Sequence, residues 1–112
     1  MKNLVNFKIA LKTREYLVQA IYQMFFNNQN PIEIIEQFKK EHELQKVDFE
    51  NFSESLVSIN KYKEEFKKIL IYLEIQDKDI NLLDKSIIYF AINELKFGNL
   101  DPLVVIDESL RL

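Results

Sequence analysis

One stretch near the start of the chain combines the residue types that bind nucleic acid. On a helix over residues 8–26, a polar stripe collects Lys8, Lys12, Gln19 and Gln23, flanked by Tyr16 and Tyr22 and with Phe26 inside it. Lysines bind phosphates, amides reach base edges, and aromatic rings stack on unpaired bases, so the mixture suits single-stranded RNA. A solvated helix face without a ligand has the same composition, and on the residues alone that interpretation is preferred.

Charge is distributed unevenly along the chain. The 112 residues have a formal net charge of −3, which by itself argues against a nucleic-acid binder. Residues 1–28 nevertheless carry four cations against Glu15 alone, a local charge of +3, and the cations are Lys2, Lys8, Lys12 and Arg14. The remaining 11 basic and 17 acidic residues give residues 29–112 a local charge of −6. This asymmetry indicates one end for a polyanion and another surface for a different partner.

Residues with catalytic or metal-binding potential are few. There is no cysteine, and the single histidine, His42, lies in a charged segment where a solvated surface side chain is expected. Two carboxylate pairs lie where helices are expected to start: Asp77 with Asp79, and Asp107 with Glu108. Carboxylates at helix starts interact favourably with the positive end of the helix dipole. The sequence therefore predicts no catalytic residue, no metal site and no cofactor, and a protein that is not an enzyme.

The elements that would position the polar stripe are helices. One glycine, two prolines and 47% hydrophobic residues predict a single all-α domain over residues 1–112. Six helices are expected, over residues 8–26, 31–38, 49–59, 62–73, 82–97 and 102–112, with Asn30, Asp48 and Asn81 as N-terminal caps and residues 39–46 as a loop. We expect two small groups, the first three helices and the later ones, with Asn60 as the break between them.

The helix over residues 82–97 is apolar around most of its circumference. Such a helix belongs at the centre of a bundle, so we expect it to be the most buried element. Ile88, Ala91 and Ile92 should then be nearly inaccessible. Gly98, the only glycine, follows where a left-handed C-terminal cap is expected, and Pro102 restarts the chain as a sixth helix.

The compartment follows from what the sequence lacks. No apolar run approaches the roughly 20 residues that cross a membrane. The first eight residues are too polar for a signal peptide. We therefore expect a cytoplasmic protein without a membrane partner.

Three segments in this order resemble the NusB family of bacterial transcription antitermination factors. Residues 13–23 are similar to the family's Arg-x-x-Ala-x-Gln-Ala-Leu-Tyr helix, with Arg14 at the arginine and Tyr22 at the tyrosine. Residues 83–95 are similar to its apolar Ala-x-Tyr-Glu-Leu helix, and residues 101–109 to its Pro-x-x-Val-x-Ile-Asn-Glu helix start. The resemblance covers nearly the whole chain, which stops about two helices before the family does. It implies a NusB-like helical bundle whose C-terminal helices are missing.

The resemblance implies an RNA-binding adaptor rather than an enzyme. Family members bind the boxA element of ribosomal RNA leaders together with the tenth small-subunit ribosomal protein, and the pair associates with RNA polymerase to prevent termination. By position, the RNA-binding residues would be Lys2, Lys8, Lys12, Arg14, Gln19 and Tyr22. Arg14 lies on the apolar side of the helix, where it could instead pair with a buried acid. Tyr22 and Asp84 would face the ribosomal protein. Residues 10–14 hold fewer cations than the family often has there, and Asn93 replaces its tyrosine, which implies weaker RNA binding.

Two other functions remain open on the sequence. The chain could be the NusB-like N-terminal domain of a ribosomal RNA cytosine methyltransferase, which would need a downstream catalytic domain. It could instead be a helical protein-interaction module with no role in RNA binding. If the fold is truncated, an apolar patch should be bare and should favour self-association, for example as a homodimer. The expected members of this patch are Leu83, Phe90, Phe97, Leu110 and Leu112.

Overall fold

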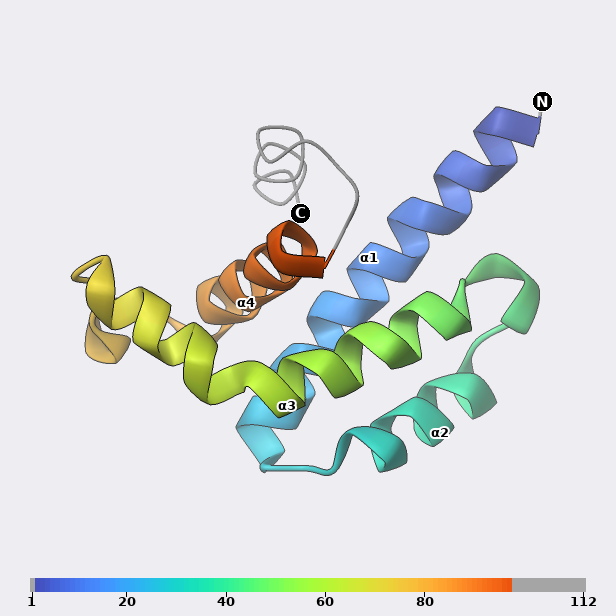
Figure 1. Ribbon diagram of the computed structural model, residues 1–112. Coiled ribbons are helices and arrows are strands. Elements are labelled where there is room, and N and C mark those ends of the chain that lie inside the picture. Colours follow the sequence, from blue (N-terminus) through green and yellow to red (C-terminus); the bar gives the residue numbers. More distant parts are fainter. Residues whose placement is uncertain (1, 98–112) are drawn as a thin grey trace.

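The computed structural model describes residues 2–97, apart from the side chains of residues 2, 3 and 77 (Figure 1). Within this range the chain is all-α, as the composition predicts. The helices are α1 (Lys2–Asn27), α2 (Pro31–Glu41), α3 (Phe49–Tyr72) and α4 (Leu82–Phe97), with short 3-10 turns at Leu44–Lys46 and Asp77–Asp79. The expected helix after Pro102, the cap at Gly98 and the bare Leu110 and Leu112 lie outside the described residues.

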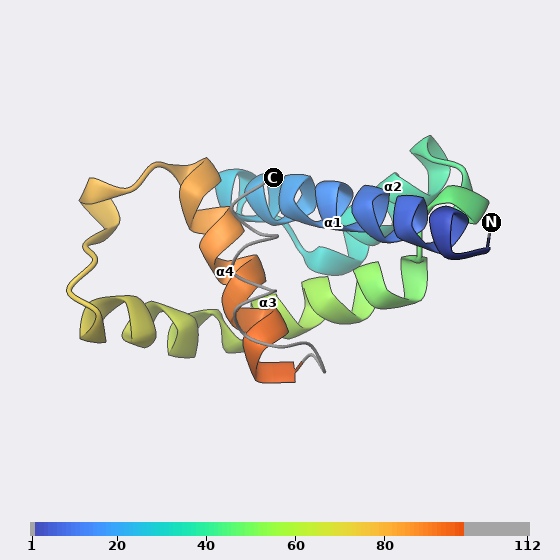
Figure 2. The same cartoon turned by 90° about the horizontal axis from the view of Figure 1, so that it is seen from above.

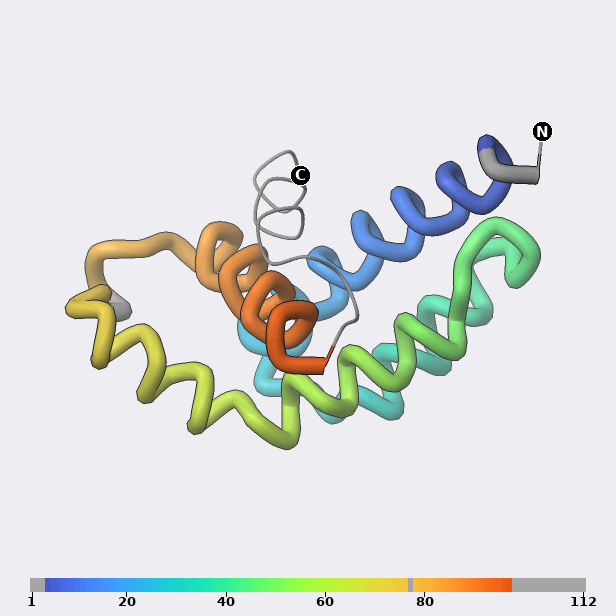
Figure 3. Tube along the Cα trace, turned by 45° about the horizontal axis from the view of Figure 1, so that its top comes forward, coloured from blue at the N-terminus to red at the C-terminus, as the bar shows by residue number. Residues whose placement is uncertain are grey.

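The helices pack around α1 and α3. α1 contacts α2, α3 and α4, and α3 contacts α2 and α4. Figure 2 shows α4 crossing from α1 towards α3, so that these three helices enclose the core from different sides. The first turns of α1 diverge from the other helices, as Figure 3 shows. Lys8, one of the expected RNA-binding residues, belongs to this N-terminal part of α1.

The core is built from one face of each helix. Its fully buried side chains include Leu17 and Ile21 of α1, Ile34 of α2, and Phe52, Leu56, Ile59 and Phe66 of α3. Aromatic rings join the helices: Phe38 lies 5.2 Å from Phe52, and Tyr89 of α4 lies 5.8 Å from Phe66. Each such side chain contributes about 1.5–3 kcal/mol on leaving water, which fixes the helix that carries the polar stripe.

The three predicted N-terminal caps are confirmed. The Asn30 side chain accepts a hydrogen bond from the backbone N–H of Ile32 at 2.8 Å, with Pro31 at the first helical position. Asp48 accepts from the N–H of Asn51 at 3.1 Å, and Asn81 accepts from the N–H of Asp84 at 2.8 Å. These bonds satisfy backbone donors that lack a partner within the helix.

Three predicted boundaries are wrong. The break at Asn60 does not exist, because α3 runs without interruption from Phe49 to Tyr72. The Asn60 side chain accepts a hydrogen bond from Nζ of Lys63 at 3.3 Å, which occupies the amide without breaking the helix. Both expected groups therefore share α3. α1 begins at residue 2 rather than 8, and the loop predicted from residue 39 is helical to residue 41, with a 3-10 turn following.

The prediction that residues 82–97 form the most buried helix is also wrong. Ile88, Ala91 and Ile92 are only half-buried, whereas Leu17, Ala20 and Ile21 of α1 are almost inaccessible. The buried face of α4 instead holds Ser86, Tyr89, Phe90 and Asn93. Phe90, predicted to be bare, is only 5% exposed, while Leu83 and Phe97 are exposed as predicted. α1 and α3 cover only one face of α4, so they cannot bury the apolar residues around its whole circumference.

Candidate nucleic-acid and partner interface

The polar stripe of α1 lies on the surface. Lys8, Gln19, Tyr22 and Phe26 are exposed, and Lys12 is half-buried. At about 100° per residue, Lys8, Lys12 and Gln19 lie within about 40° of one another around the helix. From Lys8 to Phe26 the stripe extends about 27 Å at 1.5 Å per residue. The structure therefore brings the lysines, one amide and two aromatic rings onto one accessible face.

Tyr22 and Phe26 form an aromatic platform at the far end of this stripe. Their rings are stacked, with centroids 5.9 Å apart and planes 10° from parallel. Tyr22 is 38% exposed and Phe26 69% exposed, so both rings offer a face or an edge to solvent. Exposed aromatic faces stack on unpaired bases whatever the base identity.

Lys12 is held by its neighbours on the same helix. Its Nζ lies 3.5 Å from a carboxylate oxygen of Glu15, and 5.3 Å from the centroid of the Tyr16 ring. Both members of the ion pair remain about half exposed, so water screens their attraction and the pair is weak. Lys12 therefore remains close to the surface, with a competing carboxylate beside it.

Tyr16 and Gln23, one aromatic and one amide residue of the expected stripe, have structural roles. Tyr16 stacks on His42, with ring centroids 4.1 Å apart, and meets Phe38 edge-on. His42 is therefore a half-buried packing residue at the end of α2, not the solvated side chain that its charged segment predicts. The Gln23 amide donates to Gln29 at 3.0 Å and to Gln37 at 2.8 Å, which ties α1 to α2.

Arg14 faces away from the two lysines. It is half-buried and lies about 120° around the helix from Lys8 and about 160° from Lys12. There it lines a surface cavity of about 360 Å³. The same cavity is lined by two carboxylate residues, Asp48 and Glu94. The structure thus does not bring Arg14 together with Lys8 and Lys12. The side chain of Lys2, another predicted RNA contact, lies outside the described part.

The predicted partner residues Tyr22 and Asp84 lie on two helices that pack together. Asp84 is exposed in the first turn of α4. The next residue, Lys85, holds its Nζ 5.6 Å from the ring centroid of Phe25 on α1. The start of α4 therefore lies beside the C-terminal part of α1, which carries Tyr22. A partner that covers this junction would meet an aromatic ring and a carboxylate.

The described residues offer neither a metal-binding cluster nor a membrane-spanning helix. Among residues 2–97, no cluster of histidine, aspartate or glutamate side chains is arranged to hold a metal ion. No helix of the same range is long and apolar enough to cross a membrane.

Comparison with known proteins identifies the family. The model of the NusB family matches residues 11–112. The chain is 32% identical to the transcription antitermination protein NusB of Coxiella burnetii (strain RSA 493 / Nine Mile phase I), over 94% of this chain and 78% of that protein. It is 31% identical to the protein of the same name from Psychromonas ingrahamii, over 90% and 71%, and to that from Aeromonas salmonicida, over 90% and 75%. On this evidence the chain belongs to the NusB family, whose relatives here are named as transcription antitermination proteins.

Proposed function

We propose that this chain is a non-catalytic, cytoplasmic antitermination factor that binds boxA-type single-stranded RNA with the polar stripe of α1. A second surface, containing Tyr22 and Asp84, binds the tenth small-subunit ribosomal protein, and the assembly acts on RNA polymerase. The observation that carries the proposal is the stripe itself, where exposed Lys8 and Gln19 share a helix face with the stacked rings of Tyr22 and Phe26.

The chemistry of the stripe matches the parts of an RNA strand. Lys8 and Lys12 supply charge for phosphates, and Gln19 supplies an amide that can both donate to and accept from a base edge. The Tyr22–Phe26 platform supplies a stacking surface, worth about 1–3 kcal/mol per base. Two lysines release few counterions, so the chain alone should bind RNA weakly. A protein partner that adds its own RNA contacts would raise the affinity through linkage of the two binding events.

The partner surface fits a cationic protein. Asp84 is a carboxylate at the surface, and charge complementarity across an interface favours a lysine or arginine opposite it. Tyr22, partly exposed and supported by Phe26, has the amphipathic character of an interface anchor. Tyr22 borders both the RNA-binding stripe and the partner surface. Binding of RNA and binding of the ribosomal protein should therefore both depend on Tyr22.

The test is fluorescence anisotropy with a labelled boxA-type RNA and a scrambled RNA, across salt concentrations. Lys8→Gln and Lys12→Gln should each reduce the slope of log K against log salt by about 0.7, the value for one single-strand phosphate contact. Lys39→Gln, an exposed lysine of α2 outside the stripe, is the matched control and should leave the slope unchanged. Equal binding of the RNA by all three variants would show that the stripe is not the RNA contact, and no RNA binding by the parent chain would favour an interaction module.

The ribosomal protein is tested separately. Asp84→Asn should weaken its binding while leaving the affinity for RNA alone unchanged. Tyr22→Ala should weaken both, and Tyr22→Phe, which keeps the ring, should restore RNA binding. An Asp84→Asn variant that binds the ribosomal protein normally would argue against this partner surface.

A further inference from the structure

A second basic site lies at the opposite end of α1 from Lys8. A surface cavity of about 470 Å³ is enclosed by the α1–α2 turn, the middle of α3 and the start of α4. Its lining includes lysines, aromatic rings and an amide: Lys63, Lys67, Lys85, Phe25, Tyr89 and Asn28. About 30 Å of helix separates Asn28 from Lys8 at 1.5 Å per residue, so this cavity is distinct from the cationic end of the stripe.

Charge distinguishes this cavity from the one beside Arg14. Its lining holds three lysines and one carboxylate, Glu64, a local charge of +2 in a chain whose net charge is −3. The cavity beside Arg14 holds one cation and two carboxylates, a local charge of −1. An anionic ligand is therefore favoured in the lysine-lined cavity and disfavoured in the other.

The fold positions all three lysines at this cavity. Lys63 and Lys67 are four residues apart on α3, which places them on the same helix face. Nζ of Lys63 donates to the Asn60 side chain at 3.3 Å, one turn earlier on the same helix. Nζ of Lys85 lies 5.6 Å from the ring centroid of Phe25 and 5.7 Å from that of Tyr89. The lysines thus come from two helices and converge on one opening.

The cavity offers more than positive charge. Phe25 and Tyr89 meet edge-to-face at 5.2 Å and form an aromatic part of its wall, of which Phe25 remains half-exposed. Asn28, exposed in the turn, adds an amide with two donors and an acceptor. An acidic peptide would need only the lysines. A nucleotide uses all three features, because its phosphate meets the lysines, its base edge the amide and its base plane the ring.

We infer that this cavity binds a phosphate and base of single-stranded RNA, as a second RNA contact beyond the α1 stripe. The inference rests on the proposed function, since it assigns a further part of the same ligand to another surface. Lys63 and Lys67 bind the phosphate, and Asn28 with Phe25 contacts the base. The site adds two or three cations to an RNA-binding surface whose stripe alone has few.

The test compares two double variants of equal charge on the same helix. Lys63→Gln with Lys67→Gln removes two lysines of the cavity. Lys61→Gln with Lys68→Gln removes two exposed lysines of α3 that do not line it. Both are assayed as the full 112-residue chain, by anisotropy with a twelve-nucleotide boxA-type RNA, and circular dichroism confirms that each variant melts like the parent.

We expect the cavity pair to reduce the salt slope by about 1.4 and the affinity about 25-fold at 0.1 M salt, that is about fivefold for each lost contact. The control pair should change either quantity by less than about twofold. Asn28→Ala should weaken binding without changing the slope, because it removes a base contact and no charge. Equal effects of the two lysine pairs would overturn the inference.

Further outcomes separate this inference from the proposed function. Suppose that Lys8→Gln and Lys12→Gln weaken RNA binding, while the cavity pair and the control pair bind RNA equally well. The proposed RNA contact at the stripe is then supported, and the cavity site is wrong. If only the cavity pair matters, the cavity site stands and the stripe is wrong. If the parent chain binds poly-glutamate but no RNA, and the cavity pair abolishes that binding, the cavity is a site for acidic peptide and the inference is overturned.

Discussion

The side chain of Asn93 on α4 accepts a hydrogen bond of 2.8 Å from the hydroxyl of Ser58 on α3. Asn93 is almost completely buried, so this bond satisfies a polar group that would otherwise be costly to bury. By the resemblance to the family motif, Asn93 stands where that motif has a tyrosine. The departure from the motif is thus matched by a partner on the neighbouring helix, and the pair fixes the relative position of α3 and α4.

The Ser58–Asn93 pair should be energetically coupled. Ser58→Ala should lower the free energy of unfolding by about 1–2 kcal/mol, because it leaves the Asn93 oxygen without this donor. Asn93→Ala should cost a similar amount or more, since it also opens a cavity. A double-mutant cycle by urea denaturation should return a coupling of about 1 kcal/mol. Strictly additive effects would show that the two side chains do not stabilise one another.

A glutamate occupies a left-handed position after α3. Glu74 has φ of 63°, and the backbone N–H of Ile75 reaches back to the carbonyl of Leu70 at 2.9 Å, in the geometry that ends many helices. A residue with a Cβ pays about 1–2 kcal/mol for this conformation. Glu74→Gly should therefore raise the free energy of unfolding by about 0.5–1 kcal/mol, measured by thermal or urea unfolding.

The turn after α1 supplies the control for this prediction. Asn28 also has a positive φ, of 50°, but asparagine tolerates that region better than glutamate. Asn28→Gly should therefore stabilise the chain less than Glu74→Gly. A larger gain at residue 28 than at residue 74 would contradict the explanation.

Local signals in the sequence predicted the capped helix starts well, and the start of α1 and the helix extents less well. Asn30 with Pro31 and Asn81 before α4 gave correct boundaries, because capping depends on residues within one turn. The break at Asn60 was wrong because asparagine disfavours helices only weakly, while tertiary packing decides. The signal that could have prevented the error is the apolar spacing across it, with Leu56, Ile59, Phe66 and Leu70 on one buried face.

The stripe of α1 could be predicted because it depends on a single helix. The cavity on α3 could not, because Lys63, Lys67 and Lys85 come together only when α3 and α4 pack beside the α1–α2 turn. The opposite happened at Arg14, which is near Lys12 in sequence but faces the other side of α1. The family motif placed Arg14 among the RNA contacts, although its position on the helix already put it on the apolar side.

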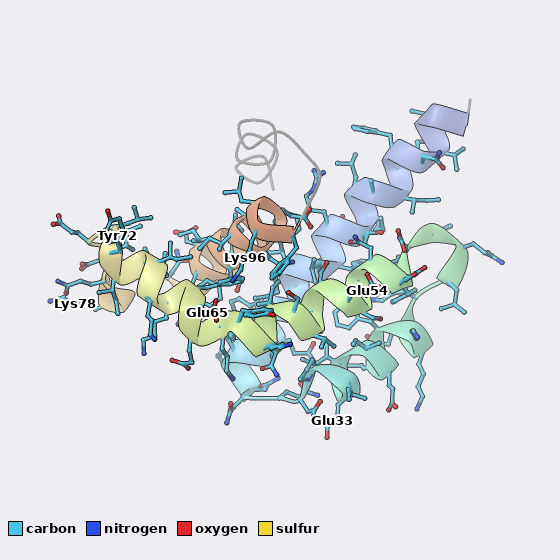
Figure 4. All side chains as sticks on the ribbon, viewed as in Figure 1. Glu33, Glu54, Glu65, Tyr72, Lys78 and Lys96 are labelled. Atoms are coloured by element: carbon cyan, nitrogen blue, oxygen red, sulfur yellow. The ribbon has the colours of Figure 1, made fainter. Side chains whose placement is uncertain are left out.

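Acid should selectively weaken one ion pair between α3 and α4. The hydrogen bond from Nζ of Lys96 to Glu65, at 2.8 Å, and the lysine's charge lower the pKa of the Glu65 carboxyl below its usual value of 4.5 (Figure 4). Because the pKa of Glu65 is lower in the folded state, the ion pair stabilises the fold fully above pH 4.5, and this stabilisation is lost as the pH falls through the lowered pKa.

The difference in Tm between the parent and Glu65→Gln should therefore shrink as the pH falls below 4.5. A difference that stays constant down to pH 2 would contradict this.

The carboxylate of Glu15 should restrain the RNA affinity of the stripe. It lies 3.5 Å from Nζ of Lys12 and places a negative charge on the face proposed to meet phosphates. Glu15→Gln keeps the side-chain length but removes this competing carboxylate, so Lys12 can bind a phosphate. RNA binding should tighten about threefold to tenfold, and the salt slope should steepen by up to about 0.7.

Glu33→Gln removes an exposed carboxylate of α2, makes the same change in net charge and is the matched control (Figure 4). Anisotropy with the boxA-type RNA distinguishes the two variants. A gain that is equal in both would reflect net charge alone and would remove the specific role assigned to Lys12, whereas a gain confined to Glu15→Gln would locate a phosphate at the middle of α1.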